Sequence, residues 1–331
     1  MKTFANANAR DLQQAVTLMQ QTHKDGKAGS FVGGGSDLLA LVKERIVSPD
    51  MLVNLKTIKG LDQVTAISGG AGGVTIGGLM TLDNLSRHPL IRRQYAVLAE
   101  AAETVATPQI RNVGTIAGNI SQRPWCWYFR NGFPCYKNGG STCFSATGEN
   151  QFHAIFGGGP SYIVHPSDTA VALVALDAKF RLVSPSGERV LPAADFFALP
   201  QQNPARENVL AAEEVVADIQ LPAPRPSTRS TYHKVMDREA WTHAVVSAAI
   251  VLEMDQQVCR SAHVVLGGVA PIPWRLPEVE RMLAGQRITE NLAVSVAEKA
   301  LEGAKPLARN GYKVPLTKGV VRRTLAELAA R

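Results

Sequence analysis

The sequence predicts an α+β protein of two or three domains, and three observations support this. At 331 residues the chain is long enough, since a domain takes roughly 100 to 200 residues. Segments with helical spacing of apolar residues and short strand-like segments both occur along its length. A proline-rich stretch, residues 221–226, is typical of a linker because proline interrupts helices and strands alike. We place a domain boundary near residue 226.

The first 56 residues predict the order helix, strand, glycine turn, helix, strand. Asn8 is expected to cap the first helix, in which Leu12, Val16 and Met19 recur at helical spacing. A strand over residues 30–32 then leads into the turn. The remaining expected elements are the turn at residues 33–37, a helix over 38–45 and a strand over 51–53.

From residue 58 onward, short strands alternate with glycine-containing turns and helices. We expect strands over 64–67, 74–76, 162–164 and 180–183, and helices over 90–105 and 169–176. Beyond the linker, strands are expected over 230–235, 244–253 and 261–269, and helices over 292–304 and 318–330. The C-terminal part is therefore expected to be a smaller α+β unit.

The composition excludes several classes of protein. Hydrophobic residues make up 45% and charged residues 19% of the chain, as in globular proteins rather than disordered or collagen-like ones. The longest apolar runs, such as residues 244–252, are far shorter than the roughly 20 residues that span a bilayer. The net charge is +7, but basic residues are scattered except at 318–323, which gives little support to nucleic-acid binding. A basic surface can equally serve to dock an acidic partner subunit. The N-terminal stretch lacks the apolar core of a signal peptide.

Two glycine-containing loops are candidates for ligand binding. In the first, a strand enters Gly33, Gly34 and Gly35 and leaves through Ser36 and Asp37 into a helix. Backbone N–H groups can converge on an anion in such a loop. A tight turn without a ligand is equally common, and the loop matches neither the Walker motif nor G-x-G-x-x-G. With the second loop, residues 114–119, it suggests a ligand held from two sides, the alternative being two plain β-turns.

Three of the four cysteines, Cys126, Cys135 and Cys143, fall within eighteen residues, in a stretch rich in aromatic side chains. Thiolates suit zinc or iron–sulfur clusters, and an apolar shell is typical of the latter. The spacings are longer than those of zinc knuckles, so a loop-borne cluster is favoured over zinc. Three reduced, buried cysteines without a metal are the alternative. A cubane needs a fourth ligand, and the candidates are His153, Ser161, His165 or a residue distant in the sequence.

Several ordered motifs give the chain a resemblance to a known family. They are residues 33–39 (GGGSDLL), 109–120 (QIRNVGTIAGNI), 165–168 (HPSD), 233–235 (HKV) with Arg238, and 266–269 (LGGV). With these motifs the whole chain resembles the FAD-binding subunit of the xanthine dehydrogenase and aldehyde oxidase class of molybdenum hydroxylases. More narrowly, it is similar to the [4Fe-4S]-bearing medium subunits of bacterial aldehyde dehydrogenases and 4-hydroxybenzoyl-CoA reductases.

The resemblance implies a specific form of the α+β fold. Residues 1–226 would form a two-part FAD-binding domain of the vanillyl-alcohol oxidase (PCMH) type, divided at residues 56 and 57. The second part would carry a cluster-binding insertion at about residues 122–160. Residues 227–331 would form a small α+β domain of the CO dehydrogenase flavoprotein type, with an antiparallel sheet.

The resemblance also assigns cofactor contacts. The first glycine loop would hold the FAD pyrophosphate, the second would approach the flavin and phosphate region, and Val216 would touch the isoalloxazine. The expected FAD-binding residues are Val32, Gly33, Gly34, Gly35, Ser36, Asp37, Leu38, Thr107, Arg111, Gly114, Thr115, Gly118, Asn119, Asp168, Val216 and Lys234.

The insertion is where the [4Fe-4S]-bearing relatives place their cluster. Cys126, Cys135 and Cys143 match three of the family's ligand positions. The fourth family cysteine lies four residues before His165, where this sequence has Ser161. A serine oxygen is a harder and much less acidic ligand than a thiol, so a serine-ligated [4Fe-4S] cluster, a [3Fe-4S] cluster and an empty loop stay open.

The activity that the resemblance implies is electron transfer within an oxidoreductase. A large partner with a molybdenum cofactor would oxidise an aldehyde or N-heterocycle. A small partner with two [2Fe-2S] clusters would pass the electrons to FAD in this chain, and an external acceptor would receive them. No catalytic residue is expected here, and His88, His233 and His243 are interpreted as structural or surface residues.

Two other functions stay open. One is a stand-alone FAD oxidoreductase of the vanillyl-alcohol oxidase type, and the other is a non-enzymatic module whose cysteines bind zinc. For the favoured function, an electron-transfer subunit, we expect a cytoplasmic complex. The complex would be periplasmic if this chain is exported together with a partner that has a signal peptide.

Overall fold

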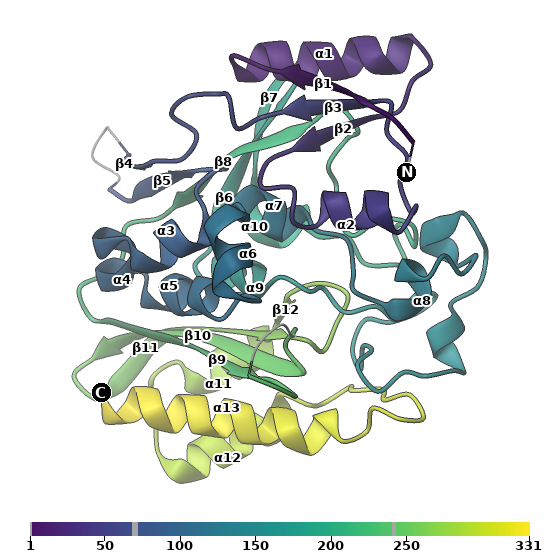
Figure 1. Ribbon diagram of the computed structural model, residues 1–331. Coiled ribbons are helices and arrows are strands. Elements are labelled where there is room, and N and C mark those ends of the chain that lie inside the picture. The colour runs from purple at the N-terminus through teal and green to yellow at the C-terminus, as the bar shows by residue number, and fades with distance from the viewer. Residues whose placement is uncertain (1, 68–71, 240–242) are drawn as a thin grey trace.

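The computed structural model describes residues 2–67, 72–239 and 243–331. Figure 1 shows three sheets stacked from top to bottom, each with helices packed beside it. The N-terminal sheet is parallel and has the strand order β1-β3-β2. Its elements are β1 Ala5–Asn8, α1 Leu12–Lys24, β2 Gly29–Val32, α2 Leu38–Lys43 and β3 Met51–Asn54.

The middle sheet is antiparallel, with the order β4-β5-β8-β6-β7. Its strands are β4 Val64–Ala66, β5 Val74–Gly77, β6 Lys179–Ser184, β7 Gly187–Pro192 and β8 Val215–Leu221. The helices beside it are α3 Leu82–Arg87, α4 Pro89–Gln94, α5 Ala96–Glu103, α6 Pro108–Val113, α7 Ile116–Ser121, α9 Asp168–Ala175 and α10 Ala193–Phe196.

The C-terminal sheet is antiparallel, with the order β12-β11-β10-β9 and β13 paired to β11. Its elements are β9 Thr228–Val235, β10 Val246–Asp255, β11 Val258–Gly267, β12 Trp274–Arg275, α11 Pro277–Leu283, β13 Gln286–Arg287, α12 Glu290–Lys299 and α13 Lys313–Ala330. Helices α5 and α9 cover one face of this sheet and α13 the other, so β10 is buried on both faces.

The cysteine-containing insertion forms a compact lobe beside α2, at the right of Figure 1. It contains α8 Trp127–Arg130 and two 3₁₀ turns, Tyr136–Asn138 and Phe144–Ala146. The rings of Tyr128, Phe133 and Phe144 meet with centroids 5.2 to 6.1 Å apart. These aromatic contacts give a segment with little regular structure a core of its own.

Some expected elements differ from the structure. Asp11, not Asn8, caps α1, because its Oδ1 accepts a hydrogen bond from the Gln14 N–H at 2.7 Å, while Asn8 ends an unpredicted strand. The single helix expected over 90–105 is interrupted at Tyr95, where φ is −135°.

Two further differences follow from hydrogen bonding. Residues 162–164 form no strand, and the Tyr162 carbonyl and the His165 N–H bond instead to loop residues Ala154 and Ala270. The second glycine loop is in fact the start of α7, because the Thr115 hydroxyl caps this helix by accepting from the Gly118 N–H.

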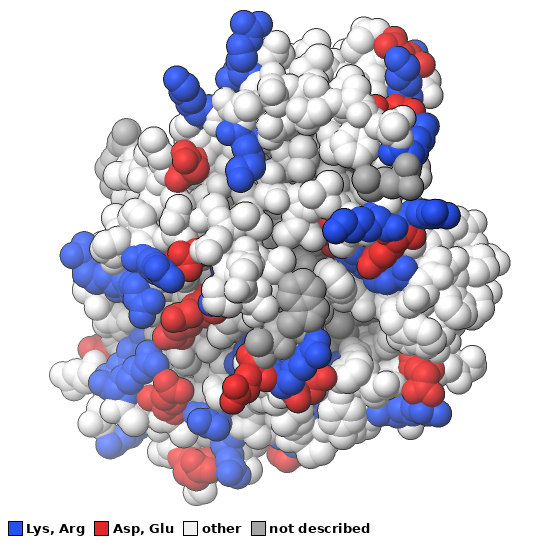
Figure 2. All heavy atoms as spheres, in the orientation of Figure 1, with Lys and Arg blue, Asp and Glu red and all other residues white. Residues whose placement is uncertain are grey.

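The surface agrees with the charge pattern of the sequence. Figure 2 shows basic and acidic side chains interspersed over the face it presents, without a continuous basic stripe. The surface at the right of this view, where Figure 1 places the cysteine lobe, carries few charged atoms. Within the described residues, no helix combines the length and the apolar character needed to cross a bilayer.

Candidate functional site

A cavity of about 780 Å³ lies between the N-terminal sheet, the middle sheet and the cysteine lobe. Its wall includes the end of β2 and the glycine loop that follows it, the start of α7, and part of β8. The loop before β8 and the first residues of the insertion complete the wall. A cavity of this size is in the range that holds a cofactor.

The glycine loop and the second loop pack directly on each other. Gly35 has φ +75°, a conformation that favours glycine. A Cβ atom on Gly34 would lie 1.9 Å from the Val113 carbonyl oxygen, at the end of α6. Glycine at position 34 is therefore required by the contact between the two loops, whether or not a ligand is bound.

The second loop is held from behind by hydroxyl groups. Asn119 is buried, and its Oδ1 accepts hydrogen bonds from the Ser167 and Thr169 hydroxyls, each at 2.6 Å. The Ser167 hydroxyl in turn accepts from the Ala170 N–H and so caps α9. The HPSD motif thus fixes the position of α7 against the cavity.

Asp168 lines the cavity and is fixed by two partners. Its Oδ1 accepts from the Tyr232 hydroxyl at 2.5 Å, and its Oδ2 from the Lys234 ammonium at 2.8 Å. All three side chains are buried, and burial, followed by the charge of Asp168, raises the pKa of Tyr232 well above its ordinary value. Tyr232 is therefore a neutral donor, and Lys234 supplies the charge that balances Asp168.

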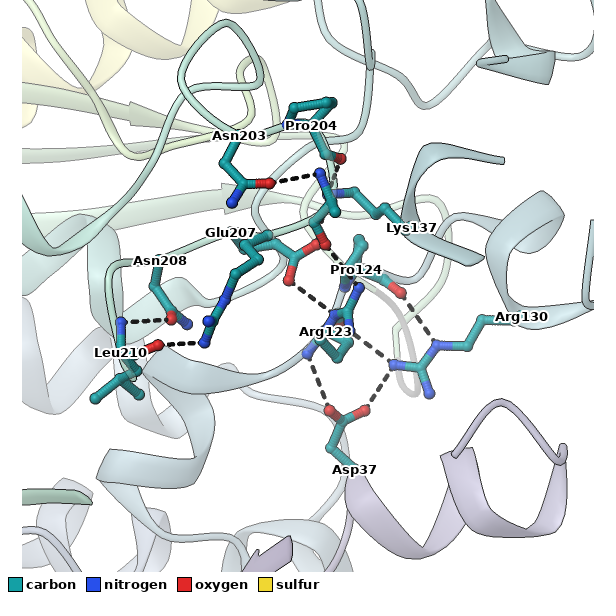
Figure 3. A network of polar contacts seen from close by, with 12 residues as sticks. Asp37, Arg123, Pro124, Arg130, Lys137, Asn203, Pro204, Glu207, Asn208 and Leu210 are labelled. Atoms are coloured by element: carbon teal, nitrogen blue, oxygen red, sulfur yellow. Dashed lines mark hydrogen bonds and ion pairs between the residues drawn. The ribbon is translucent and has the colours of Figure 1, made fainter. Parts of the chain in front are cut away.

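A network of charged side chains joins the glycine loop, the insertion and the loop before β8 (Figure 3). Asp37 accepts from the Arg123 backbone N–H at 3.0 Å and from the Arg130 guanidinium at 2.6 Å. Glu207 pairs with Arg123 at 2.8 Å and with Lys137 at 2.5 Å. Three cations of the insertion are thus balanced by carboxylates from two other segments.

A second, much smaller cavity of about 10 Å³ lies inside the cysteine lobe. Cys126, Cys135, Cys143 and Ser161 all line it, and none of the four cysteines of the chain forms a disulfide. Aromatic side chains complete much of its wall. Within the described residues, no three side chains of His, Cys, Asp or Glu are arranged to hold a single metal ion. The thiols instead surround a space.

Hydrogen-bonding groups contact two of these thiols. The Cys126 Sγ lies 3.4 Å from His153 Nε2, and the Cys143 Sγ lies 3.1 Å from the Ser145 hydroxyl. Burial raises the pKa of Cys126 to about 11 and lowers that of His153 to about 4. Both groups are therefore neutral. The Cys126 thiol would lose its proton only where a cation or a metal binds the sulfur.

The candidates for a fourth ligand are placed differently. Ser161 lines the small cavity and is 3% exposed. His153 contacts Cys126. His165 lies with its ring against Phe197, and its Nδ1 accepts from the Ser167 N–H. Ser161, predicted as the fourth ligand position, therefore lines the same cavity as the three thiols.

Comparison with known proteins decides the family. Residues 2–224 match the FAD binding domain in molybdopterin dehydrogenase, and residues 231–328 match the CO dehydrogenase flavoprotein C-terminal domain. The chain belongs to the FAD-binding subunits of the molybdenum hydroxylase family. These matches confirm the family predicted from the sequence motifs. They also confirm the prediction that the chain is a subunit of an oxidoreductase.

Individual relatives agree. The aldehyde oxidoreductase FAD-binding subunit PaoB of Escherichia coli (strain K12) is 36% identical over 335 residues and covers 100% of both chains. The carbon monoxide dehydrogenase medium chain of Hydrogenophaga pseudoflava is 26% identical and covers 97% of this chain and 96% of the relative.

Solved structures confirm the fold class. Carbon monoxide dehydrogenase from Hydrogenophaga pseudoflava has a chain that superposes with a TM-score of 0.77 at 24% identity, covering 99% of this chain and 98% of that one. Quinoline 2-oxidoreductase from Pseudomonas putida 86 gives a TM-score of 0.76 at 22% identity, covering 100% and 99%. The α+β architecture with a C-terminal antiparallel sheet is therefore that of the family.

The large cavity fits the FAD of this family. It is bordered by backbone of the glycine loop on one side and by apolar side chains such as Leu79 and Val216 on another. The predicted residues that line it are Val32, Gly33, Gly34, Gly35, Ser36, Asp37, Leu38, Gly114, Thr115, Gly118, Asn119, Asp168 and Val216. Thr107, Arg111 and Lys234 lie behind this wall in the described structure, and their roles as FAD contacts stay predictions.

Those three residues support the wall indirectly. Thr107 caps α6 by accepting from the Ile110 N–H. Arg111 donates to the carbonyl of Val105, a residue of the wall, and Lys234 holds Asp168.

Sequence reasoning missed part of the cavity wall. His243, expected to be structural or at the surface, lines the cavity, and its ring centroid lies 5.3 Å from that of Trp125. Arg206, Glu207 and Trp125 also line it. Trp125 could have been found from the sequence, because it directly precedes Cys126 in the cysteine-containing stretch. Nothing in the sequence connects Glu207 to the insertion.

Proposed function

We propose that this chain is the electron-transfer subunit of a heterotrimeric molybdenum-containing aldehyde dehydrogenase, with an N-heterocycle as the alternative substrate class. A large molybdenum subunit would oxidise the substrate, and a small subunit with [2Fe-2S] clusters would deliver electrons to FAD in this chain. The carrying observation is the large cavity built from the family's glycine loop and HPSD motif. The 36% identical relative named as an aldehyde oxidoreductase subunit favours an aldehyde.

The residues of this chain bind and orient the cofactor, and bound FAD supplies the redox chemistry. The glycine loop and Asn119 present the wall on two sides, and Val216 offers an apolar surface. Asp168 carries a charge that Lys234 and Tyr232 hold in place. The carboxylates of the wall are all engaged in ion pairs, which fits a site without a general base; they are Asp37, Asp168, Glu207 and Glu214.

Addition of an aldehyde to the purified complex under anaerobic conditions tests this function. The account predicts that the flavin absorption is bleached, because electrons from the molybdenum subunit reach FAD. A complex that contains FAD and oxidises aldehyde but keeps its flavin oxidised would contradict the proposal. A bleached flavin in this chain purified without partners would support a stand-alone oxidase instead.

We further propose that the cysteine lobe holds an iron–sulfur cluster. Three thiols and Ser161 line one small cavity together with several aromatic side chains, which matches the ligand types and the aromatic surroundings typical of such a cluster. Cys126, Cys135 and Cys143 would bind iron as thiolates. Ser161 would stand at the fourth position, giving a serine-ligated [4Fe-4S] or a [3Fe-4S] cluster.

The Ser161→Cys variant distinguishes these two forms. If the native cluster lacks its fourth iron, the variant should contain one additional iron per flavin, and its EPR spectrum should change from a [3Fe-4S] to a [4Fe-4S] type. Unchanged iron in the variant with a [4Fe-4S] spectrum in both proteins would assign the fourth iron to Ser161. If both proteins contain no iron beyond that of the small partner's [2Fe-2S] clusters, the cysteine lobe holds no cluster and the proposal is refuted.

A further inference from the structure

One buried ion pair separates the two cavities. Glu207 lines the large cavity and Lys137 lines the small one. The Lys137 Nζ and the Glu207 Oε1 are 2.5 Å apart, and the two side chains are 3% and 2% exposed. The pair therefore has its negative end toward the FAD cavity and its positive end toward the cysteines.

The surrounding contacts fix this orientation. The Lys137 ammonium donates to the Pro204 carbonyl at 3.2 Å, in the loop before β8. The other oxygen of Glu207 pairs with Arg123, whose side chain is 30% exposed and reaches the rim of the large cavity. Neither member of the pair can turn toward water without losing these partners (Figure 3).

The neighbouring charges differ between the two ends of the pair. Arg130 is balanced by Asp37 at 2.6 Å and by Glu44 at 3.5 Å. The Arg123 guanidinium pairs with the other Glu207 oxygen and lines the large cavity, so two cations flank this carboxylate. Lys137 is thus the cation of this network that lines the cysteine cavity.

Stability alone is a weak explanation for such a pair. Removing two charges from water is energetically costly, and their mutual attraction offsets only part of that cost. In a weakly polar interior, however, a charge acts over a longer distance than in water. A cation beside a redox centre favours its reduced form, and an anion disfavours it.

We propose that the Lys137–Glu207 pair is a buried dipole that favours the transfer of an electron from the flavin to the cluster. This inference rests on the proposed function, in which both cavities hold a redox centre. Lys137 raises the midpoint potential of the cluster, and Glu207 lowers that of the flavin. The transferred electron is lost by the flavin and gained by the cluster, and the external acceptor then removes it.

The test is a double variant, Lys137→Gln with Glu207→Gln, in the complete complex. Replacing both partners leaves neither Lys137 nor Glu207 behind as an unpaired buried charge. Arg123, which loses Glu207, is 30% exposed to water, so the fold is expected to survive. Spectroelectrochemistry of the flavin and EPR titration of the cluster measure the two midpoint potentials. We expect the cluster potential to fall and the flavin potential to rise. The equilibrium constant for transfer should fall about tenfold, which corresponds to about 59 mV for one electron.

A matched control neutralises another partly buried pair. Arg275 and Glu280, in the C-terminal domain, are 2.9 Å apart and line neither cavity within the described residues. The variant Arg275→Gln with Glu280→Gln should leave both potentials unchanged. If the Lys137 and Glu207 double variant keeps FAD and iron but shows unchanged potentials, the pair is structural and the inference is overturned.

Two safeguards keep the outcomes distinct. Iron analysis of the native complex comes first, because a complex without cluster iron refutes the cluster itself and the dipole with it. If the double variant loses FAD, the single variant Glu207→Gln keeps Lys137 and its bond to Pro204. It should raise the flavin potential more than the cluster potential. A larger shift at the cluster would contradict the proposed orientation.

Discussion

At the scale of single residues, the structure gives a different physical reason for the glycine at position 34 than the sequence motif suggests. The sequence suggests that Gly34 lets the backbone approach a pyrophosphate. The structure shows that a Cβ there would meet the Val113 carbonyl oxygen at 1.9 Å. A motif identifies the position, but which neighbour requires the glycine depends on a contact between segments about 80 residues apart in the sequence.

The Gly34→Ala variant is therefore expected to be destabilised before any ligand is considered. Forcing apart the glycine loop and the end of α6 should cost roughly 1 to 3 kcal/mol and weaken FAD retention as well. Thermal unfolding of the variant measures the first effect. Gly319→Ala, in open space on α13, should be neutral or slightly stabilising. Equal melting temperatures for Gly34→Ala and the native protein would refute the steric argument.

His165 predicts a dependence of stability on pH. Burial lowers the pKa of His165 from 6.5 to about 3. Between these values the unfolded chain binds a proton that the folded chain does not, so stability falls as the pH is lowered through this window. The slope should be roughly 1.4 kcal/mol per pH unit. Denaturant unfolding at several pH values should show a smaller slope for His165→Gln, and identical slopes would contradict the assignment.

At the scale of elements, patterns predicted long, amphipathic or β-branched segments well and short ones poorly. The strands β9, β10 and β11 were predicted close to their observed bounds. β10 and β11 contain apolar runs, whereas β9 is mostly polar but rich in Thr, Tyr and Val. β1, Ala5–Asn8, was missed, since its residues are mostly exposed and its pairing partner is β3, far along the chain. Helix α7 appeared as a glycine loop because it has only six residues.

The insertion is expected to act as part of the FAD site. Its Arg130 donates to Asp37 of the glycine loop and also stacks on Trp125 with 4.2 Å between guanidinium carbon and ring centroid. Arg130→Gln should weaken FAD binding roughly tenfold, the effect of about 1.4 kcal/mol. Fluorescence of released FAD measures this. The control Arg92→Gln removes a surface pair with Glu103, and an equal effect in both variants would refute the role of Arg130.

At the scale of the whole molecule, the motifs predicted the family and the fold, but not how the parts are joined. The insertion is tied to the C-terminal domain by buried polar groups: Asn310 donates to the carbonyls of His153 and Ala154, and Lys313 to those of Phe152 and Gly268. These partners lie 45 to 161 residues apart. No local sequence pattern predicts contacts between residues so far apart in the sequence. The Lys137–Glu207 pair was not predicted for the same reason.

Lys313 should hold the cysteine lobe on the C-terminal domain. Lys313→Met leaves two buried carbonyls without their donor and should cost roughly 1 to 3 kcal/mol. The melting temperature of the complex measures this loss. Lys318→Met, on the same helix, removes only an exposed ion pair with Glu298 and should change it little. Comparable losses in the two variants would show that Lys313 has no special role.

The central claim is that FAD and an iron–sulfur cluster occupy neighbouring cavities of this one chain. Iron and acid-labile sulfide per flavin, measured on the purified complex, test it most directly. The account predicts about three or four iron atoms in excess of the four that the two [2Fe-2S] clusters of the small partner supply. Four iron atoms per flavin would show that the cysteine lobe holds no cluster, and a complex without flavin would contradict the account as a whole.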